Sequence, residues 1–167
     1  QSWGVREGSM VGLYVGRIAA EKNLPVVARS FFEVKKRIPD FQGVFVGDGP
    51  LLKEMKKEHP EFIYAGVQRG DDLAEHYASA DLFVFPSITE AFGNVTLEGM
   101  ASGLAVVAYD YAAARQHIIS GHNGFSVPFN DEEAFVAAVV DAAKSDLTDL
   151  RAEARSSARK VRWKKVV

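Results

Sequence analysis

The chain has 167 residues, 47% of them hydrophobic, and a formal net charge of −2, which suits one domain with a sizeable core and gives no electrostatic case for binding nucleic acid or an anionic membrane. It contains no cysteine and only four scattered histidines, which excludes disulfides and thiolate metal sites and argues against zinc. No apolar run approaches the roughly 20 residues of a membrane helix, so we expect a soluble, cytoplasmic protein.

Short β-branched and aromatic runs alternate with segments of helical period along the chain. We predict strands at residues 11–15, 43–46, 62–65, 82–85, 105–108 and 125–127. Six strands alternating with helices favour an α/β fold with a doubly wound, mainly parallel, Rossmann-like sheet. The nearly continuous apolar strands are consistent with burial on both faces.

Polar residues mark several expected helix starts. Asn23 is predicted to cap the helix that follows the first strand, and Asp72 with Glu75 resembles a capping box for a helix ending near residue 79. Asn130 and Glu133 are predicted to cap the helix after the sixth strand.

The domain is expected to span residues 10–167. Residues 1–9 are interpreted as a linker or a remnant of a preceding segment. The basic end, 154–167, reads as a helix cut short, and a solvated helix face is favoured for 151–165 over contact with a membrane or another domain.

In the common doubly wound order 3-2-1-4-5-6, the first and fourth strands are neighbours, and ligands bind outside their carboxyl ends. The loops expected there are 16–22 and 86–94. Arg17 and Lys22, on a loop hinged by Gly16, supply two cations suited to a diphosphate. Gly93 and Asn94 place backbone N–H groups at a helix start, a second anion site.

Two glutamates, Glu90 and Glu98, accompany these anion-binding groups. Carboxylates accept hydrogen bonds from sugar hydroxyls. If a ribose and a hexose lay on either side of a diphosphate, each glutamate could bind the hydroxyls of one sugar. The combination points to a nucleotide-sugar. Taken alone, Glu98 could be an acid near a helix start, and Glu90 a solvated loop residue.

The segment Gly47-Asp48-Gly49-Pro50 suggests a dinucleotide-binding loop. However, Leu52 stands where the third glycine belongs, and the motif follows the second strand rather than the first. We therefore expect a tight turn into a helix, which could still border a ligand.

Several ordered motifs resemble the C-terminal domain of family-4 retaining glycosyltransferases. These motifs are GRIAAEK at 16–22, VGDGP at 46–50, SADLFVFPS at 79–87, EAFGNVTLE at 90–98 and GHNGFSVP at 121–128. The resemblance implies one half of a GT-B fold, with an N-terminal acceptor domain absent from this sequence. It implies a transferase that moves a hexosyl unit with retention from a nucleotide-sugar to a saccharide or lipid. This chain alone is expected to bind the donor without turning it over.

By the same resemblance, Arg17 and Lys22 would hold the donor diphosphate and stabilise the leaving nucleotide. Glu98 would take the ribose hydroxyls, and Glu90 would position the donor sugar near the reacting carbon. The remaining donor-binding positions would be Gly16, Val67, Phe92, Gly93, Asn94 and Val95. Asp71 could help to read the base. No metal or other cofactor is expected, and membrane association would come only through the missing domain, with the whole protein at the inner face of the membrane.

One loop departs from the family pattern. Many members carry Gly-Gly-x-Pro-Glu after the fifth strand, whereas this chain has DYAAARQ at 110–116, with Gln116 near the position of the glutamate. This loop is interpreted either as a specialised wall of the sugar side or as an ordinary helix opening. Three other functions stay open, namely a non-catalytic nucleotide-sugar sensor, a sugar-nucleotide epimerase and a structural module without nucleotide affinity.

Overall fold

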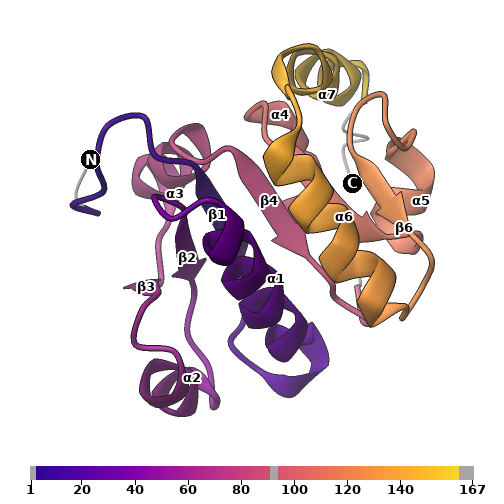
Figure 1. The fold of residues 1–167 in the computed structure, drawn as a ribbon. Coiled ribbons are helices and arrows are strands. Elements are labelled where there is room, and N and C mark those ends of the chain that lie inside the picture. Colours follow the sequence, from indigo (N-terminus) through magenta and orange to yellow (C-terminus); the bar gives the residue numbers. More distant parts are fainter. Residues whose placement is uncertain (1–2, 91–93, 162–167) are drawn as a thin grey trace.

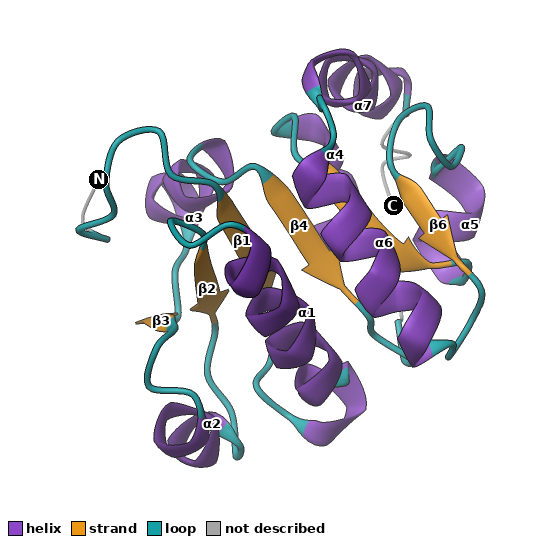
Figure 2. Ribbon diagram, in the orientation of Figure 1, coloured by secondary structure: helices purple, strands orange, loops and turns teal. Residues whose placement is uncertain are grey.

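A computed structural model describes residues 3–90 and 94–161. These residues form a six-stranded sheet with helices on both faces, and each pair of neighbouring strands is parallel (Figures 1 and 2). The strand order is β3-β2-β1-β4-β5-β6, which confirms the predicted doubly wound topology. The reversal of strand order between β1 and β4 creates the switch point at which the two candidate loops emerge.

The elements alternate as the sequence predicts. The strands are β1 (Val11–Val15), β2 (Gln42–Val46), β3 (Ile63–Gly66), β4 (Leu82–Phe85), β5 (Ala105–Tyr109) and β6 (Phe125–Val127). The helices are α1 (Leu24–Arg37), α2 (Leu52–Glu58), α3 (Gly70–Ala78), α4 (Asn94–Ala101), α5 (Ala112–His117), α6 (Glu132–Lys144) and α7 (Thr148–Lys160), with a short 3-10 helix η1 (Ala20–Lys22). No predicted strand boundary is wrong by more than one residue.

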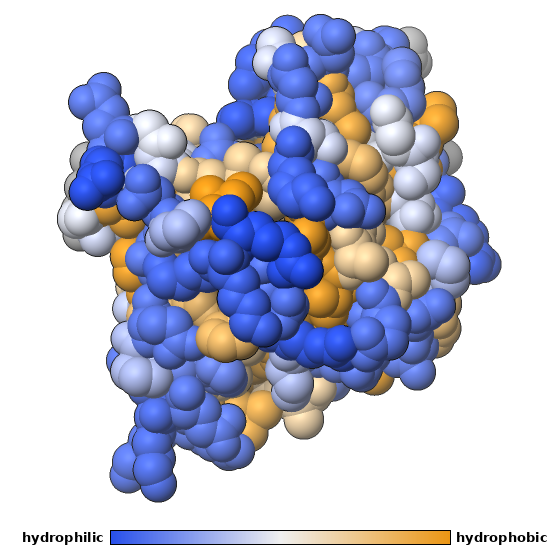
Figure 3. All heavy atoms as spheres, in the orientation of Figure 1, coloured by the Kyte–Doolittle hydropathy of each residue, from blue (hydrophilic) through white to orange (hydrophobic). Residues whose placement is uncertain are grey.

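Helices α1 and α6 lie together on one face of the sheet (Figure 1). Glycines bring α1 close, because a Cβ on Gly12 would lie 2.7 Å from the Phe31 ring and one on Gly43 would lie 2.4 Å from it. Figure 3 shows this face, where hydrophilic side chains flank an apolar seam between the two helices. The ion pair of Arg29 with Glu133, at 2.6 Å, spans that seam.

Two of the predicted side-chain caps are wrong, although Asn23 does directly precede α1 as expected. Asn23 makes no side-chain capping bond and adopts a left-handed conformation with φ of 57°. Helix α3 begins at Gly70, so Asp72 and Glu75 lie inside the helix and form no capping box. Asp72 instead lies in the first turn, where a carboxylate interacts favourably with the helix dipole.

The start of α6 differs from the prediction by one residue. The capping side chain is Asp131, which accepts a bond of 3.0 Å from the Ala134 N–H. Asn130 precedes it in a left-handed conformation, and Glu133 belongs to the first turn. Aspartate and asparagine cap helices about equally well, so the sequence alone does not choose between adjacent residues of the two types.

Asp81 anchors the amino ends of two central strands. Its Oδ2 accepts a 2.9 Å bond from the Val11 N–H, and its Oδ1 pairs with Arg151 at 3.0 Å. Arg151 also donates to the Gly103 carbonyl at 2.6 Å. This residue therefore ties α7 to the sheet and to the end of α4, rather than lying on a solvated helix face as predicted.

Candidate functional site

The loop after β1 is built on the loop after β2. The Gly16 N–H donates to the Val46 carbonyl at 3.0 Å, and the Ile18 N–H donates to the Asp48 carbonyl at 2.9 Å. A Cβ on Gly47 would lie 1.9 Å from the Gly16 carbonyl oxygen. The VGDGP segment thus forms the predicted turn into a helix, and it also supports the backbone that carries Arg17, a role that the sequence analysis did not assign.

Arg17 presents its side chain to solvent from this supported loop. Its side chain is 63% exposed and pairs with Glu21 at 3.2 Å. The buried Tyr14 hydroxyl donates to the Arg17 carbonyl at 2.8 Å, and a Cβ on Gly16 would lie 2.7 Å from that hydroxyl. The backbone is therefore held from below while the guanidinium stays available to a ligand.

Lys22 joins the two loops at the switch point. Its Nζ donates to the Thr89 carbonyl at 3.2 Å and lies 5.8 Å from the centre of the Phe85 ring. The Ser87 hydroxyl donates to the same carbonyl at 2.6 Å. The loops after β1 and β4 are thus in direct contact. The ammonium group of Lys22 binds the carbonyl of the residue that precedes Glu90 in the chain.

Glu90 is partly buried and lines a small cavity between β4, β5 and the start of α5, together with Tyr109 and Tyr111. Burial, with smaller contributions from the carboxylates of Glu21 and Glu90, raises the pKa of Tyr14. Because Glu90 is partly buried and lines this cavity, it is not a fully solvated loop residue.

Glu98 lies on the side of α4 that faces α3. Its Oε2 accepts a 2.9 Å hydrogen bond from the hydroxyl of Tyr77, which lies on α3. Glu98 also borders an open groove of about 280 Å³ between α3 and α4. It is the fifth residue of its helix, beyond the first turn where an acid benefits most from the dipole. The two glutamates therefore line two different hollows.

The other predicted site residues lie after β3 and at the starts of α3 and α4. Val67 is 56% exposed after β3, and Asp71 is exposed in the first turn of α3. Asn94 and Val95 open α4 as predicted, whereas Phe92 and Gly93 lie outside the described residues.

The loop at 110–116, which departs from the family pattern, leads into α5. Tyr111 is the N-cap residue, and Ala112 adopts a left-handed φ of 48°. Arg115 turns back to Asp110, with its Nε 3.3 Å from Oδ1, and Gln116 is exposed. The backbone of this loop matches the interpretation as an ordinary helix opening. Tyr111 also lines the cavity that contains Glu90, so the loop could in addition form a wall of the sugar-binding side.

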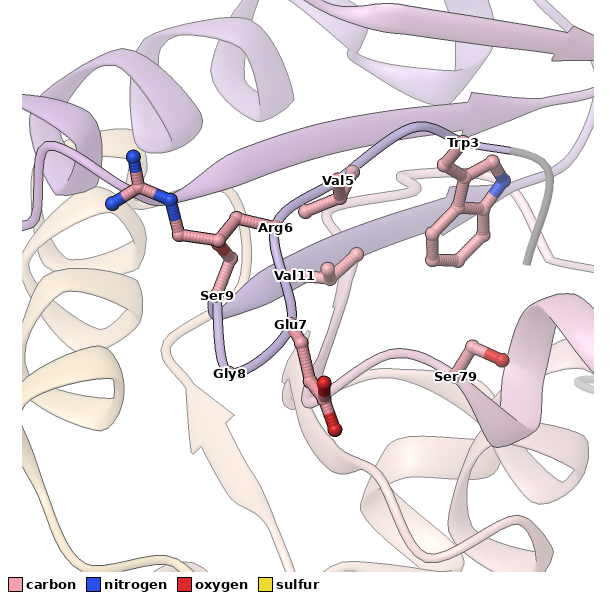
Figure 4. A pocket seen from close by; sticks show the side chains of 8 residues that line it. All are labelled: Trp3, Val5, Arg6, Glu7, Gly8, Ser9, Val11 and Ser79. Carbon is pink, nitrogen blue, oxygen red and sulfur yellow. The ribbon is translucent and has the colours of Figure 1, made fainter.

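A third hollow lies at the amino ends of β1 and β4, away from these loops. Figure 4 shows Trp3, Arg6 and Glu7 around it, and the Trp3 ring packs edge-on against His76 at 5.2 Å between centroids.

Across residues 3–90 and 94–161 no group of three or more metal-ligating side chains gathers, and no helix there is long and apolar enough to cross a membrane.

A family model described as glycosyl transferases group 1 matches residues 10–145. The sulfoquinovosyl transferase of Arabidopsis thaliana is 40% identical over 98 residues, which are 58% of this chain and 18% of that protein. A GDP-mannose-dependent alpha-mannosyltransferase of Corynebacterium glutamicum is 34% identical over 128 residues, 74% of this chain and 29% of that protein. The chain thus spans less than a third of either relative.

Solved structures share the fold. The crystal structure of the pneumococcal O-GlcNAc transferase GtfA, in complex with UDP and GlcNAc, superposes with a TM-score of 0.79 at 22% identity. The match covers 95% of this chain and 33% of that one. It supports the Rossmann-like architecture that the sequence predicts.

Proposed function

Because the chain belongs to glycosyl transferases group 1, we propose that it binds the nucleotide-sugar donor of a retaining hexosyltransferase. The observation that carries the proposal is the contact of Lys22 with the Thr89 carbonyl at 3.2 Å. That contact joins a cationic loop to a glutamate-bearing loop at the switch point, where open α/β sheets bind ligands.

Arg17 and Lys22 take the diphosphate in this proposal. During transfer, the bond between the anomeric carbon and the diphosphate oxygen breaks, and its electron pair stays on the departing nucleotide. Cations fixed beside that oxygen stabilise the developing charge. The support for this role is the backbone ladder beneath Arg17, which holds the loop before any ligand arrives. Since two side chains supply positive charge, we expect donor binding without added metal.

The two glutamates divide the hydroxyl groups of the donor. Glu90, in the cavity beside Tyr109 and Tyr111, is assigned to the hexose and sits near the reacting carbon. Glu98, on the α3 side of α4, is assigned to the ribose. Val67 and Asp71 border the base, and Asn94 and Val95 offer backbone N–H groups to the ligand.

The acceptor requires a second domain. Closure of that domain over the cleft would bring the acceptor hydroxyl to the anomeric carbon and exclude water. A saccharide or lipid acceptor and a location at the inner face of the membrane, reached through the other domain, belong to the same proposal. Residues 1–9 would then lead into the domain from the preceding segment.

Saturation-transfer NMR with an intact nucleotide-sugar tests the donor assignment. We expect saturation on the base, ribose and hexose protons of the donor, and none on free hexose at the same concentration. Glu90→Gln should reduce the hexose signals selectively. Equal saturation of all three parts in the variant, or a donor that does not bind, would contradict the proposal.

A further inference from the structure

The hydroxyl of Tyr77 fixes the carboxylate of Glu98 before any ligand is bound. Tyr77, which donates the hydrogen bond, is a buried side chain on α3 that is 3% exposed. Glu98, which accepts it, is a partly exposed residue of α4. The Tyr77 ring packs against Phe83 at 5.7 Å between centroids. A ring held in the core therefore presents its hydroxyl at a fixed point, and a flexible carboxylate takes its orientation from it.

The bond leaves Glu98 able to accept further hydrogen bonds. A carboxylate has two oxygens with about four acceptor positions, and Tyr77 occupies one position on Oε2. The same carboxylate borders the open groove between α3 and α4. Two adjacent hydroxyl groups, such as the 2′- and 3′-hydroxyls of a ribose, can therefore approach the side of Glu98 that faces solvent.

We propose that Tyr77 is a positioning residue for ribose recognition, acting through Glu98. This inference rests on the proposed function and concerns the ribose part of the same site. A free glutamate must give up rotamer freedom when it binds a diol, at a cost of entropy. Here the hydrogen bond from α3 has already restricted the carboxylate, so less of that cost falls on binding.

The test compares matched ribo- and 2′,3′-dideoxyribonucleoside diphosphates by calorimetric titration, using whichever of UDP, GDP or ADP binds best. Tyr77→Phe removes the hydroxyl and keeps the buried ring. We expect the preference for ribose to fall about fivefold to tenfold, as for the loss of one hydrogen bond. Affinity for the dideoxy compound should stay unchanged, because the diphosphate and base contacts are untouched.

Tyr64→Phe is the matched control. Its hydroxyl also donates to protein groups, the carbonyls of Met55 and His59, each at 2.9 Å, and none of these residues lies on α4. It should leave the ribose preference at the wild-type value. A double-mutant cycle adds Glu98→Ala, in whose background Tyr77→Phe should have no further effect on that preference.

The outcomes separate the inference from the function on which it rests. The positioning role is supported if three results hold together. The preference for ribose falls in Tyr77→Phe, it stays at the wild-type value in Tyr64→Phe, and Tyr77→Phe no longer changes it once Glu98 is replaced by alanine. An unchanged preference in Tyr77→Phe, while Glu98→Ala abolishes it, overturns the inference and leaves the donor assignment standing. A wild-type chain that binds none of the nucleotides contradicts both.

Discussion

Replacing Gly47 with alanine should displace the loop that carries Arg17. The added Cβ would lie 1.9 Å from the Gly16 carbonyl oxygen, where contacts under 3.0 Å do not occur, so one backbone must move by about 1 Å. Gly47 also has a φ of 139°, a conformation that side chains disfavour. Strain and overcrowding of these kinds each cost about 1–3 kcal/mol, so we expect a loss of about 2–6 kcal/mol in the free energy of unfolding.

Urea unfolding and calorimetric titration with a nucleoside diphosphate together test this prediction. Gly121→Ala is the control, since Gly121 also has a positive φ, 80°, but nothing lies within 4 Å of its added Cβ. That variant should pay only the backbone strain, about 1–2 kcal/mol, and bind nucleotide normally. If Gly47→Ala loses no more stability than the control and keeps its affinity, the loop after β2 does not support the site.

Three further predictions concern stability and charge. Asp81→Ala should lower the free energy of unfolding by about 2–4 kcal/mol, because it removes the acceptor of the Val11 N–H and the carboxylate paired with Arg151, which would keep only its bonds to backbone carbonyls; urea unfolding measures this, and a loss below 0.5 kcal/mol, the scale of an ordinary surface substitution, would contradict it. Lys22→Ala should weaken diphosphate binding about tenfold and flatten its dependence on salt in titrations at two ionic strengths; equal salt dependence would refute the contact. Burial raises the pKa of Tyr64 and of Tyr109 to about 12, from an ordinary value of 10.0. The unfolded chain then loses these protons first, so the melting temperature should fall as the pH rises from 10 to 12, and a constant melting temperature would show the reasoning wrong.

Hydrophobic pattern was enough to predict the sheet. Strands that are buried on both faces read as short apolar runs, and helices between them force parallel pairing, so the order around β1 and β4 followed from one common topology. The helix caps were less predictable. Asn23 has a suitable side chain but a left-handed backbone, and Asp131 caps α6 next to the equally suitable Asn130.

The sequence also placed Arg17, Lys22 and Glu90 around one switch point, because the loops after neighbouring parallel strands emerge at the same edge. It could not reveal what orients these groups. The hydrogen bond from Tyr77 to Glu98 joins residues 21 positions apart on different helices, and the fit of Gly47 against Gly16 depends on a close approach of two backbones. Neither contact leaves a local pattern in the chain.

Calorimetric titration of this chain with UDP, GDP and ADP, in the absence of metal, tests the central claim most directly. The donor-site account predicts that at least one nucleotide binds and that Arg17→Ala weakens its binding at least tenfold, since a charged hydrogen bond to phosphate is lost. A wild-type chain that binds none of the three, or an Arg17→Ala variant that binds as tightly as the wild type, would contradict it.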